Sequence, residues 1–281
     1  MSFDLSTPAI PRGYTTISGK ELRIEGFWFL TVHCSLLTVM IDGHAHLNEI
    51  NDIDAAISRA ASAGVYAIIG VGMDIESNRA TLDIAGRFPG IVYPAVGYHP
   101  WSIVPDEIER NLAFVEERLP FCVALGEVGI DYKTKIKKQV QWEVYERLLS
   151  MAKTADKPVI IHSRFSYSRT FEMTASAGIE RAVFHWFTGE KEVLTGLLDS
   201  GYFISVTPAL AYSPFHRDAA AFAPLERIMV ETDAPVEYQG KISEPADLIL
   251  ALRELARIKG ISVEEAAGIT ELNTRSFYRL G

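Results

Sequence analysis

Residues 36–47 read LLTVMIDGHAHL, a run of apolar and β-branched residues that leads into Asp42, His44 and His46. Such a run predicts a strand that is buried on both faces, as in parallel sheets. A doubly wound sheet of the dinucleotide-binding kind would carry a glycine-rich GxGxxG turn after its first strand, and DGHAHL stands there instead. The stretch therefore favours the other common parallel architecture, a closed barrel.

Seven further apolar runs follow along the chain, with helical segments between them. The runs are VYAIIGVG (65–72), IVYPAVGYH (91–99), FCVALGEVG (121–129), PVIIHSR (158–164), RAVFHWF (181–187), YFISVTP (202–208) and RIMVETDAP (227–235). Helices are predicted at 52–63, 75–88, 105–118, 190–200 and 246–258, and shorter ones after residues 168, 214 and 262. The clearest helical pattern follows residue 136, where apolar residues recur at steps of three or four: Ile136, Val140, Val144, Leu148 and Met151. Eight strands alternating with helices predict an α/β fold, namely a single (β/α)8 TIM barrel. The barrel is predicted over residues 40–281, and residues 1–39 form an N-terminal extension of unknown role.

The composition limits the class of protein. A net charge of −9 does not fit a broad basic face for long duplex nucleic acid, although a small basic pocket for a strand end is compatible with it. Cys34 and Cys122 form no CxxC pair, which argues against a disulfide framework and a thiolate zinc site. The apolar segment 27–41 is shorter than the roughly 20 residues of a membrane span. These features predict a cytoplasmic protein without a membrane anchor.

Polar residues stand where the predicted strands end, which is where TIM barrels carry their active sites. They are Asp42, His44, His46, His99, Glu127, Asp131, His162, Arg164, His185, Glu231 and Asp233. One such histidine is more often an ordinary polar residue than a ligand. Five of the seven histidines lie at these ends, however, and a divalent cation is a reason for imidazoles and carboxylates to converge. His44 and His46, two residues apart on a strand, point to the same side.

Two carboxylates, Glu127 and Asp233, are the candidate anionic ligands. A carboxylate can bridge two ions about 3.5–4 Å apart, and Glu127 is predicted at the middle of the site. The alternatives are that Asp233 is a turn residue before Pro235, and that Glu127 is a buried carboxylate paired with Arg164. Both residues lie at the same strand ends as the histidines, so the metal interpretation is favoured.

Lysines and aromatic residues fill the loops around these strand ends. The lysines Lys133, Lys135, Lys137 and Lys138 precede a predicted helix, where the helix dipole disfavours cations. These lysines indicate either a site for an anionic substrate or a stretch of charged side chains exposed to solvent. The aromatic residues Tyr98, Trp101, Tyr132, Tyr167, Trp186 and Phe187 are suited either to stacking bases or to packing.

The motifs together resemble the TatD family of metal-dependent hydrolases. They are DGHAHL (42–47), VGYHP (96–100), GEVGIDY (126–132), VIIHSR (159–164), FHWFTG (184–189), ETDAP (231–235) and the closing NTRSFYRL (273–280). The resemblance covers residues 40–281. It implies a barrel with two divalent metal ions, zinc, manganese or magnesium, in which one ion is held by His44, His46, Glu127 and Asp233, and the other by Glu127, His162 and His185.

The resemblance also implies a deoxyribonuclease that removes nucleotides from DNA strand ends, although some relatives are linked to removal of D-amino acids from tRNA. The chain departs from the family pattern at Phe165, Trp186 and Ser243, where Asp, Cys and Asn are usual. No ligand position is lost. The changed positions shape the pocket, and they therefore bear on the choice of substrate.

The hypothesis for the mechanism is hydrolysis of a phosphodiester by metal-activated water. Asp233 and Glu127 are the candidate catalytic residues, and Asp233 is the candidate general base. His99, Arg164 and Lys133 are candidates to hold the substrate phosphate. The first alternative is an amidohydrolase or D-aminoacyl-tRNA deacylase that acts on an amide or ester, although many amidohydrolases place a lysine where Glu127 stands. The second is a metal-binding barrel without catalysis.

Overall fold

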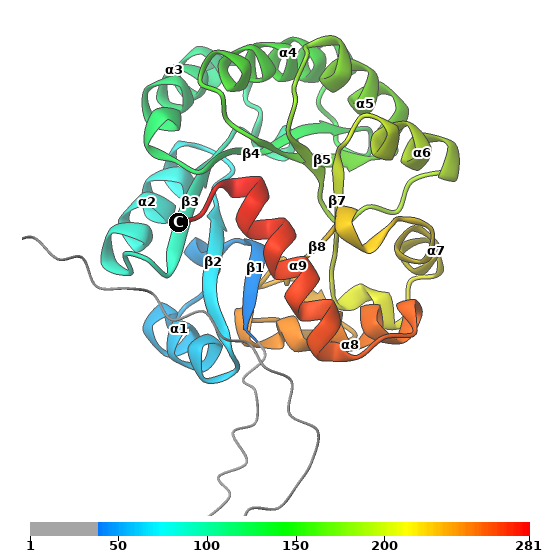
Figure 1. Ribbon diagram of the computed structural model, residues 1–281. Coiled ribbons are helices and arrows are strands. Elements are labelled where there is room, and N and C mark those ends of the chain that lie inside the picture. Colours follow the sequence, from blue (N-terminus) through cyan, green and yellow to red (C-terminus); the bar gives the residue numbers. More distant parts are fainter. Residues whose placement is uncertain (1–38) are drawn as a thin grey trace, which may run out of the picture. The chain divides into compact units, whose positions relative to one another are not determined.

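The computed structural model describes residues 39–281, so the predictions for residues 1–38 lie outside the described residues. Eight parallel strands form one sheet in the order of the sequence, β1 to β8, and Figure 1 shows them surrounded by helices. The strands are β1 (Met40–Ala45), β2 (Val65–Val71), β3 (Val92–Val96), β4 (Ala124–Asp131), β5 (Val159–Arg164), β6 (Ala182–Phe184), β7 (Phe203–Val206) and β8 (Ile228–Val230). The predicted TIM barrel is confirmed.

The sheet closes through residues at the end of β1 and just after β8. Ala45 forms a parallel bridge with Ala234, and the amide of Asp233 donates a hydrogen bond of 3.0 Å to the carbonyl of His44. The amide of His46 donates to the carbonyl of Ala234 at 2.7 Å. The closure therefore brings the segments around His44 and Asp233, far apart in the chain, into register at the C-terminal ends of the strands. We call this end the upper end of the barrel.

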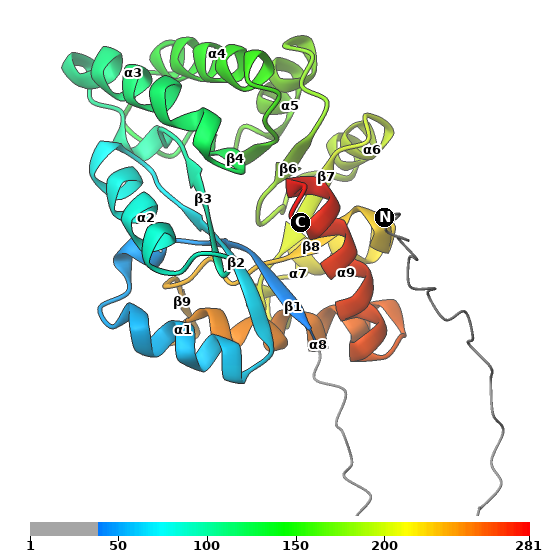
Figure 2. The same cartoon turned by 60° about the vertical axis from the view of Figure 1, so that its left-hand side comes forward.

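The helices lie outside the strands in both views of the molecule (Figures 1 and 2). Their bounds are α1 (Ile53–Ser62), α2 (Ile75–Arg87), α3 (Ile108–Arg118), α4 (Lys138–Thr154), α5 (Tyr167–Ser176), α6 (Lys191–Asp199), α7 (Pro214–Phe222), α8 (Leu248–Lys259) and α9 (Val263–Tyr278). The prediction was wrong at three helix starts. Ile136 precedes α4, residues 105–107 form a separate 3-10 turn before α3, and residues 245–247 form another before α8. Among the apolar residues predicted to lie on one face of α4, Val144 and Leu148 are buried in the core.

The lower end of the barrel, where the strands begin, is covered by α9, which crosses the strands in Figure 1. Asn273 on this helix donates hydrogen bonds of 2.8 Å to the carbonyls of Leu225 and Ile228, just before and at the start of β8. Phe277 and Tyr278 then pack with apolar side chains from most of the strands, namely Ile41, Ala67, Ile69, Val71, Ala95, Ala124, Ile160, Val183 and Met229. The core of this end is therefore apolar.

Residues 39–281 contain no helix that is both long and apolar enough to cross a membrane. Most of the apolar segment 27–41 noted in the sequence lies outside the described residues. Cys122 is 2% exposed and belongs to the core, as its apolar neighbours predict.

Candidate metal centre

Four side chains meet at the upper end of β1, β4 and β8. His44 lies in β1, His46 follows it, Glu127 lies in β4, and Asp233 follows β8. Five of the distances between His44 Nε2, His46 Nε2, Glu127 Oε2 and Asp233 Oδ1 are 3.2 to 3.5 Å. A tetrahedral shell with metal–ligand bonds of about 2.0–2.1 Å has edges of about 3.3–3.4 Å. The spacing of these four atoms therefore fits a single divalent cation.

Glu127 lies between this group and a second group of histidines. Its Oε2 faces His44 and His46, while its Oε1 lies 2.8 Å from both His162 Nδ1 and His185 Nε2. His162 belongs to β5 and His185 follows β6 directly. One carboxylate thus presents a separate oxygen to each histidine group, which is the arrangement that a bridging ligand requires.

Several ligand atoms in this cluster are buried without a partner of their own. Asp233 Oδ1, His44 Nδ1 and His185 Nδ1 make no hydrogen bond to any residue of 39–281. An unpaired buried polar atom is unfavourable and calls for an explanation such as an ion or water. For Asp233 Oδ1, which is also one of the four evenly spaced atoms, a bound cation is the natural partner. The donor set, imidazole nitrogens and carboxylate oxygens, suits several divalent metals.

The cluster is electrostatically coupled. Burial lowers the pKa of His46, but the carboxylates of Asp233 and Glu127 beside the ring outweigh it and raise that pKa to about 10. Burial would raise the pKa of Glu127, yet His185, His99 and His162 hold that pKa well below its usual value. The two carboxylates are therefore anionic across the physiological range and are balanced by positive charge on neighbouring imidazoles, a charge that a metal ion can replace.

His99 lies inside the cluster rather than at its edge. Its Nε2 is 3.3 Å from Glu127 Oε1, and its Nδ1 accepts a hydrogen bond from the amide of Trp101. Burial lowers the pKa of His99 to about 4, so the ring is neutral. His99, Glu127 and His162 also form one of the groups whose ligand atoms lie close enough to share an ion.

Arg164 and Lys133, the other two candidates for holding phosphate, line one pocket beside the cluster. This pocket has a volume of about 400 Å³ and is lined by Trp101, Asp131, Lys133, Thr134, Lys135, Ile136 and Arg164. It adjoins the metal cluster through Asp131, whose Oδ2 lies 3.1 Å from His162 Nε2. Only two of the four predicted lysines, Lys133 and Lys135, line this pocket. Lys137 is the residue before α4, and Lys138 Nζ lies over the ring of Tyr132, 4.0 Å from its centroid.

The structure decides between several alternatives left open by the sequence. Asp233 does belong to a turn, since its carbonyl accepts a bond from Val236, but its side chain faces the histidines. Glu127 contacts histidines, and no ion pair joins it to Arg164. Of the aromatic candidates, Tyr98 and Phe187 are buried in the core, whereas Trp101 is 56% exposed at the pocket.

Two carboxylates received no role from the sequence although both stand at strand ends. Asp131 contacts His162 Nε2 and accepts a hydrogen bond from Trp101 Nε1 at 2.5 Å. Glu231 lies 3.4 Å from His185 Nδ1 and accepts a hydrogen bond from the amide of Trp186. Such contacts orient metal-binding imidazoles. The available signal was their position in the sequence. Asp131 lies four residues after Glu127 in β4, and Glu231 directly follows β8, two residues before Asp233.

Metal-dependent hydrolases are the class of protein in which a (β/α)8 barrel carries such a cluster at the C-terminal ends of its strands. Within that class, this chain belongs to the TatD related DNase family, whose family model matches residues 41–279. The chain is 29% identical to the human deoxyribonuclease TATDN3 over 259 residues, which are 85% of this chain and 94% of that protein.

Two bacterial proteins are similar to this chain over the same region. The metal-dependent hydrolase YabD of Bacillus subtilis is 30% identical over 258 residues, 86% of this chain and 100% of that protein. The crystal structure of YjjV, a TatD homologue from Escherichia coli, superposes with a TM-score of 0.79 at 27% identity and covers 87% of this chain and 100% of that one. The chain is a metal-dependent hydrolase, and the barrel accounts for nearly the whole of these relatives.

Proposed function

We propose that this chain is a deoxyribonuclease that hydrolyses phosphodiester bonds at the ends of DNA strands with two divalent metal ions. One ion is held by His44, His46, Glu127 and Asp233, and the other by Glu127, His162 and His185. The observation that carries the two-metal assignment is the position of Glu127, with one carboxylate oxygen toward each histidine group. The names of the relatives support the choice of DNA as substrate.

Bound divalent ions of this kind supply an activated water and neutralise charge on phosphoryl oxygens. Asp233 is proposed as the general base that takes the proton from the attacking water, because its carboxylate lies among the metal-binding imidazoles, where that water would be held. Its pKa is below the usual value despite burial, owing to the neighbouring histidines led by His46, so the carboxylate is available as a base at neutral pH.

The basic pocket beside the cluster is proposed to hold the phosphate that follows the scissile bond. Lys133 and Arg164 line it, and Lys135 adds a third cation. In a protein with a net charge of −9, this is a local concentration of positive charge next to the metal ligands. A small basic patch of this kind suits the end of a strand better than the side of a long duplex, which a broad basic face would grip.

The proposal extends to the whole chain in two respects. Residues 40–281 form the hydrolase domain and residues 1–39 an extension to it. The protein acts in the cytoplasm, which fits two cysteines without a disulfide pattern and the burial of Cys122.

The test is incubation of single-stranded DNA with Mg²⁺, Mn²⁺ or Zn²⁺, comparing the natural chain with Asp233→Asn. Mononucleotide release by the natural chain, and its absence in the variant at equal protein concentration, is the expected result. Aminoacyl-tRNA and a panel of small amides are run in parallel, since cleavage of these without cleavage of DNA contradicts the proposal. Failure to bind any divalent metal in a folded protein would favour a barrel without catalysis.

A further inference from the structure

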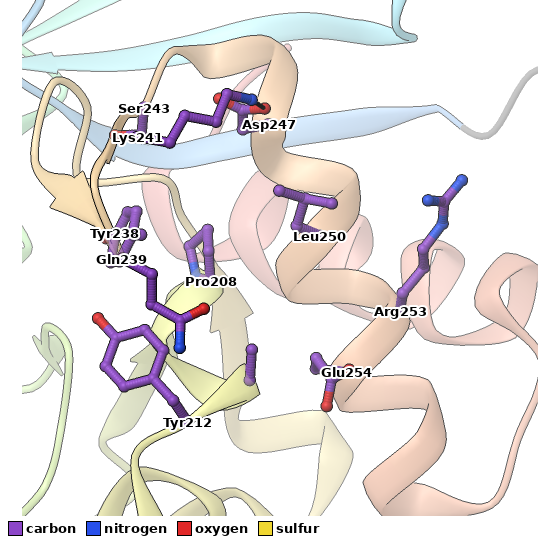
Figure 3. Close-up of a pocket in the computed structure, with 11 residues that line it drawn as sticks. Pro208, Tyr212, Tyr238, Gln239, Lys241, Ser243, Asp247, Leu250, Arg253 and Glu254 are labelled. Carbon is purple, nitrogen blue, oxygen red and sulfur yellow. Dashed lines mark hydrogen bonds and ion pairs between the residues drawn. The ribbon is translucent and has the colours of Figure 1, made fainter.

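A second cavity lies beside the upper end, outside the metal cluster and the basic pocket. It is formed by the 3-10 turn η5 (Pro208–Ala211), the hairpin strands β9 (Glu237–Tyr238) and β10 (Lys241–Ile242), and helix α8. Figure 3 shows these elements enclosing it, with Tyr212, Gln239 and Tyr238 on one side and Leu250 on the other. Its volume of about 230 Å³ is below the roughly 300–1,000 Å³ of pockets for drug-sized ligands, so the cavity has room for one small planar group.

Three of the four charged residues that line this cavity are paired, namely Lys241, Asp247 and Glu254. Lys241 lies 2.6 Å from Asp247, and Glu254 lies 2.8 Å from Arg257. Figure 3 shows the guanidinium of Arg253 pointing away from the tyrosines. The cavity therefore presents no unpaired cation toward the tyrosines, in contrast to the basic pocket around Lys133. Its occupant should be neutral.

The polar and aromatic groups that remain match a nucleobase. Tyr212 is 42% exposed and presents an aromatic ring at one end, and Gln239 carries an amide that both donates and accepts hydrogen bonds. Ser243 lines the cavity, is 4% exposed, and its Oγ has no hydrogen-bond partner within residues 39–281. An aromatic ring combined with hydrogen-bonding side chains is how proteins bind an unstacked base.

The cavity is connected to the metal centre by Tyr238. The hydroxyl of Tyr238 donates a hydrogen bond of 2.8 Å to the carbonyl of Thr232, the residue before the ligand Asp233. Its ring lies 5.5 Å, centroid to centroid, from that of Trp186, which follows the ligand His185. A strand whose phosphate lies at the metal cluster can thus pass over Trp186 and Tyr238 and place a neighbouring base in the cavity.

We propose that this cavity is a subsite for one base of the DNA substrate near the cleaved bond, an inference that rests on the proposed function. Tyr212 stacks on the base, while Gln239 and Ser243 hydrogen-bond to its edge. The phosphate on one side of the upper end and the base on the other would together position the strand end.

The test compares a single-stranded oligonucleotide with versions that carry one abasic nucleotide at each of the first four positions from the cleaved end. For the natural chain, one abasic position should lower kcat/KM by about fivefold or more, the range of single base–aromatic contacts. In Tyr212→Ala the intact oligonucleotide should lose a similar factor, and the preference for the base at that position should disappear. Ser243→Ala should reduce the same preference by a smaller factor.

Phe215→Ala is the matched control, because Phe215 is an aromatic residue of the neighbouring α7, is 71% exposed, and does not line the cavity. It should keep the positional preference of the natural chain. If no abasic position matters, or if the preference survives in Tyr212→Ala, the subsite is overturned while the nuclease stands. If the natural chain releases no nucleotide from any oligonucleotide, the proposed function fails, and the subsite falls with it.

Discussion

The two ends of the barrel differ in almost every physical property. The lower end is closed by Phe277 and Tyr278 of α9, which pack on apolar strand residues. The upper end buries five histidines and the four acids that contact them, with several atoms unpaired. Its loops hold Phe165, Trp186 and Asp233 at positive φ. Non-glycine residues rarely adopt that conformation, and it clusters at functional sites.

The difference shows how one fold separates stability from activity. Apolar burial at the lower end contributes to the free energy of folding, whereas buried polar groups at the upper end are costly unless paired. Changes at the two ends should therefore have opposite consequences. Those at the upper end should remove activity from a folded protein, and those at the lower end should weaken the fold while leaving the chemistry intact.

The largest effect is expected at Glu127. Because its two carboxylate oxygens face different histidine groups, Glu127→Ala should lose both metal ions and lower kcat/KM on DNA by about a thousandfold or more. His162→Ala, which removes a side chain from one group only, should keep about one metal ion. Metal content after dialysis, measured by mass spectrometry, tests this. Equal metal content in the two variants would contradict a bridging role.

At the lower end, Phe277→Ala should reduce the free energy of unfolding by about 3–5 kcal/mol, because a buried ring leaves a cavity. Urea denaturation provides the measurement. At low temperature the variant should keep its metal content and activity. Leu272→Ala on the same helix is the control, since Leu272 is 62% exposed and should change stability by less than about 0.5 kcal/mol. A similar loss in both variants would show that α9 does not act through this packing.

Metal affinity should rise with pH. In the metal-free protein the pKa of His46 is raised to about 10, so below that pH a binding metal must displace a proton from it. The apparent association constant should therefore increase about tenfold for each pH unit between 6 and 8, equivalent to about 1.4 kcal/mol per unit. Competition with a fluorescent chelator measures it. An affinity that does not change over this range would contradict the predicted charge on the cluster.

The smallest effect is expected for Lys133, which supplies one of the cations of the basic pocket. Lys133→Ala should raise KM for single-stranded DNA several-fold and make binding less dependent on salt, with the slope of log K against log salt reduced by about 0.7. Lys137→Ala is the control, because Lys137 does not line that pocket. The same change in both variants would indicate a general effect of charge.

Some features were predictable because they are local. Each strand is a short apolar run bounded by polar residues, and a parallel barrel places all strand ends on one side, so His44, Glu127, His162 and Asp233 could be expected to converge. Element boundaries were less predictable. Ile136 continues the apolar spacing of α4 but precedes the helix, because hydrophobic periodicity does not show where backbone hydrogen bonds begin.

The sequence by itself determined the barrel, the order of its strands and the set of residues at its upper end, because these depend on patterns along the chain. Only the tertiary structure decided which oxygen of Glu127 faces which histidines, that Asp131 and Glu231 contact His162 and His185, and that η5, the β9–β10 hairpin and α8 enclose a cavity. Those facts depend on side-chain directions and on contacts between segments far apart in the chain, which no spacing in the sequence records.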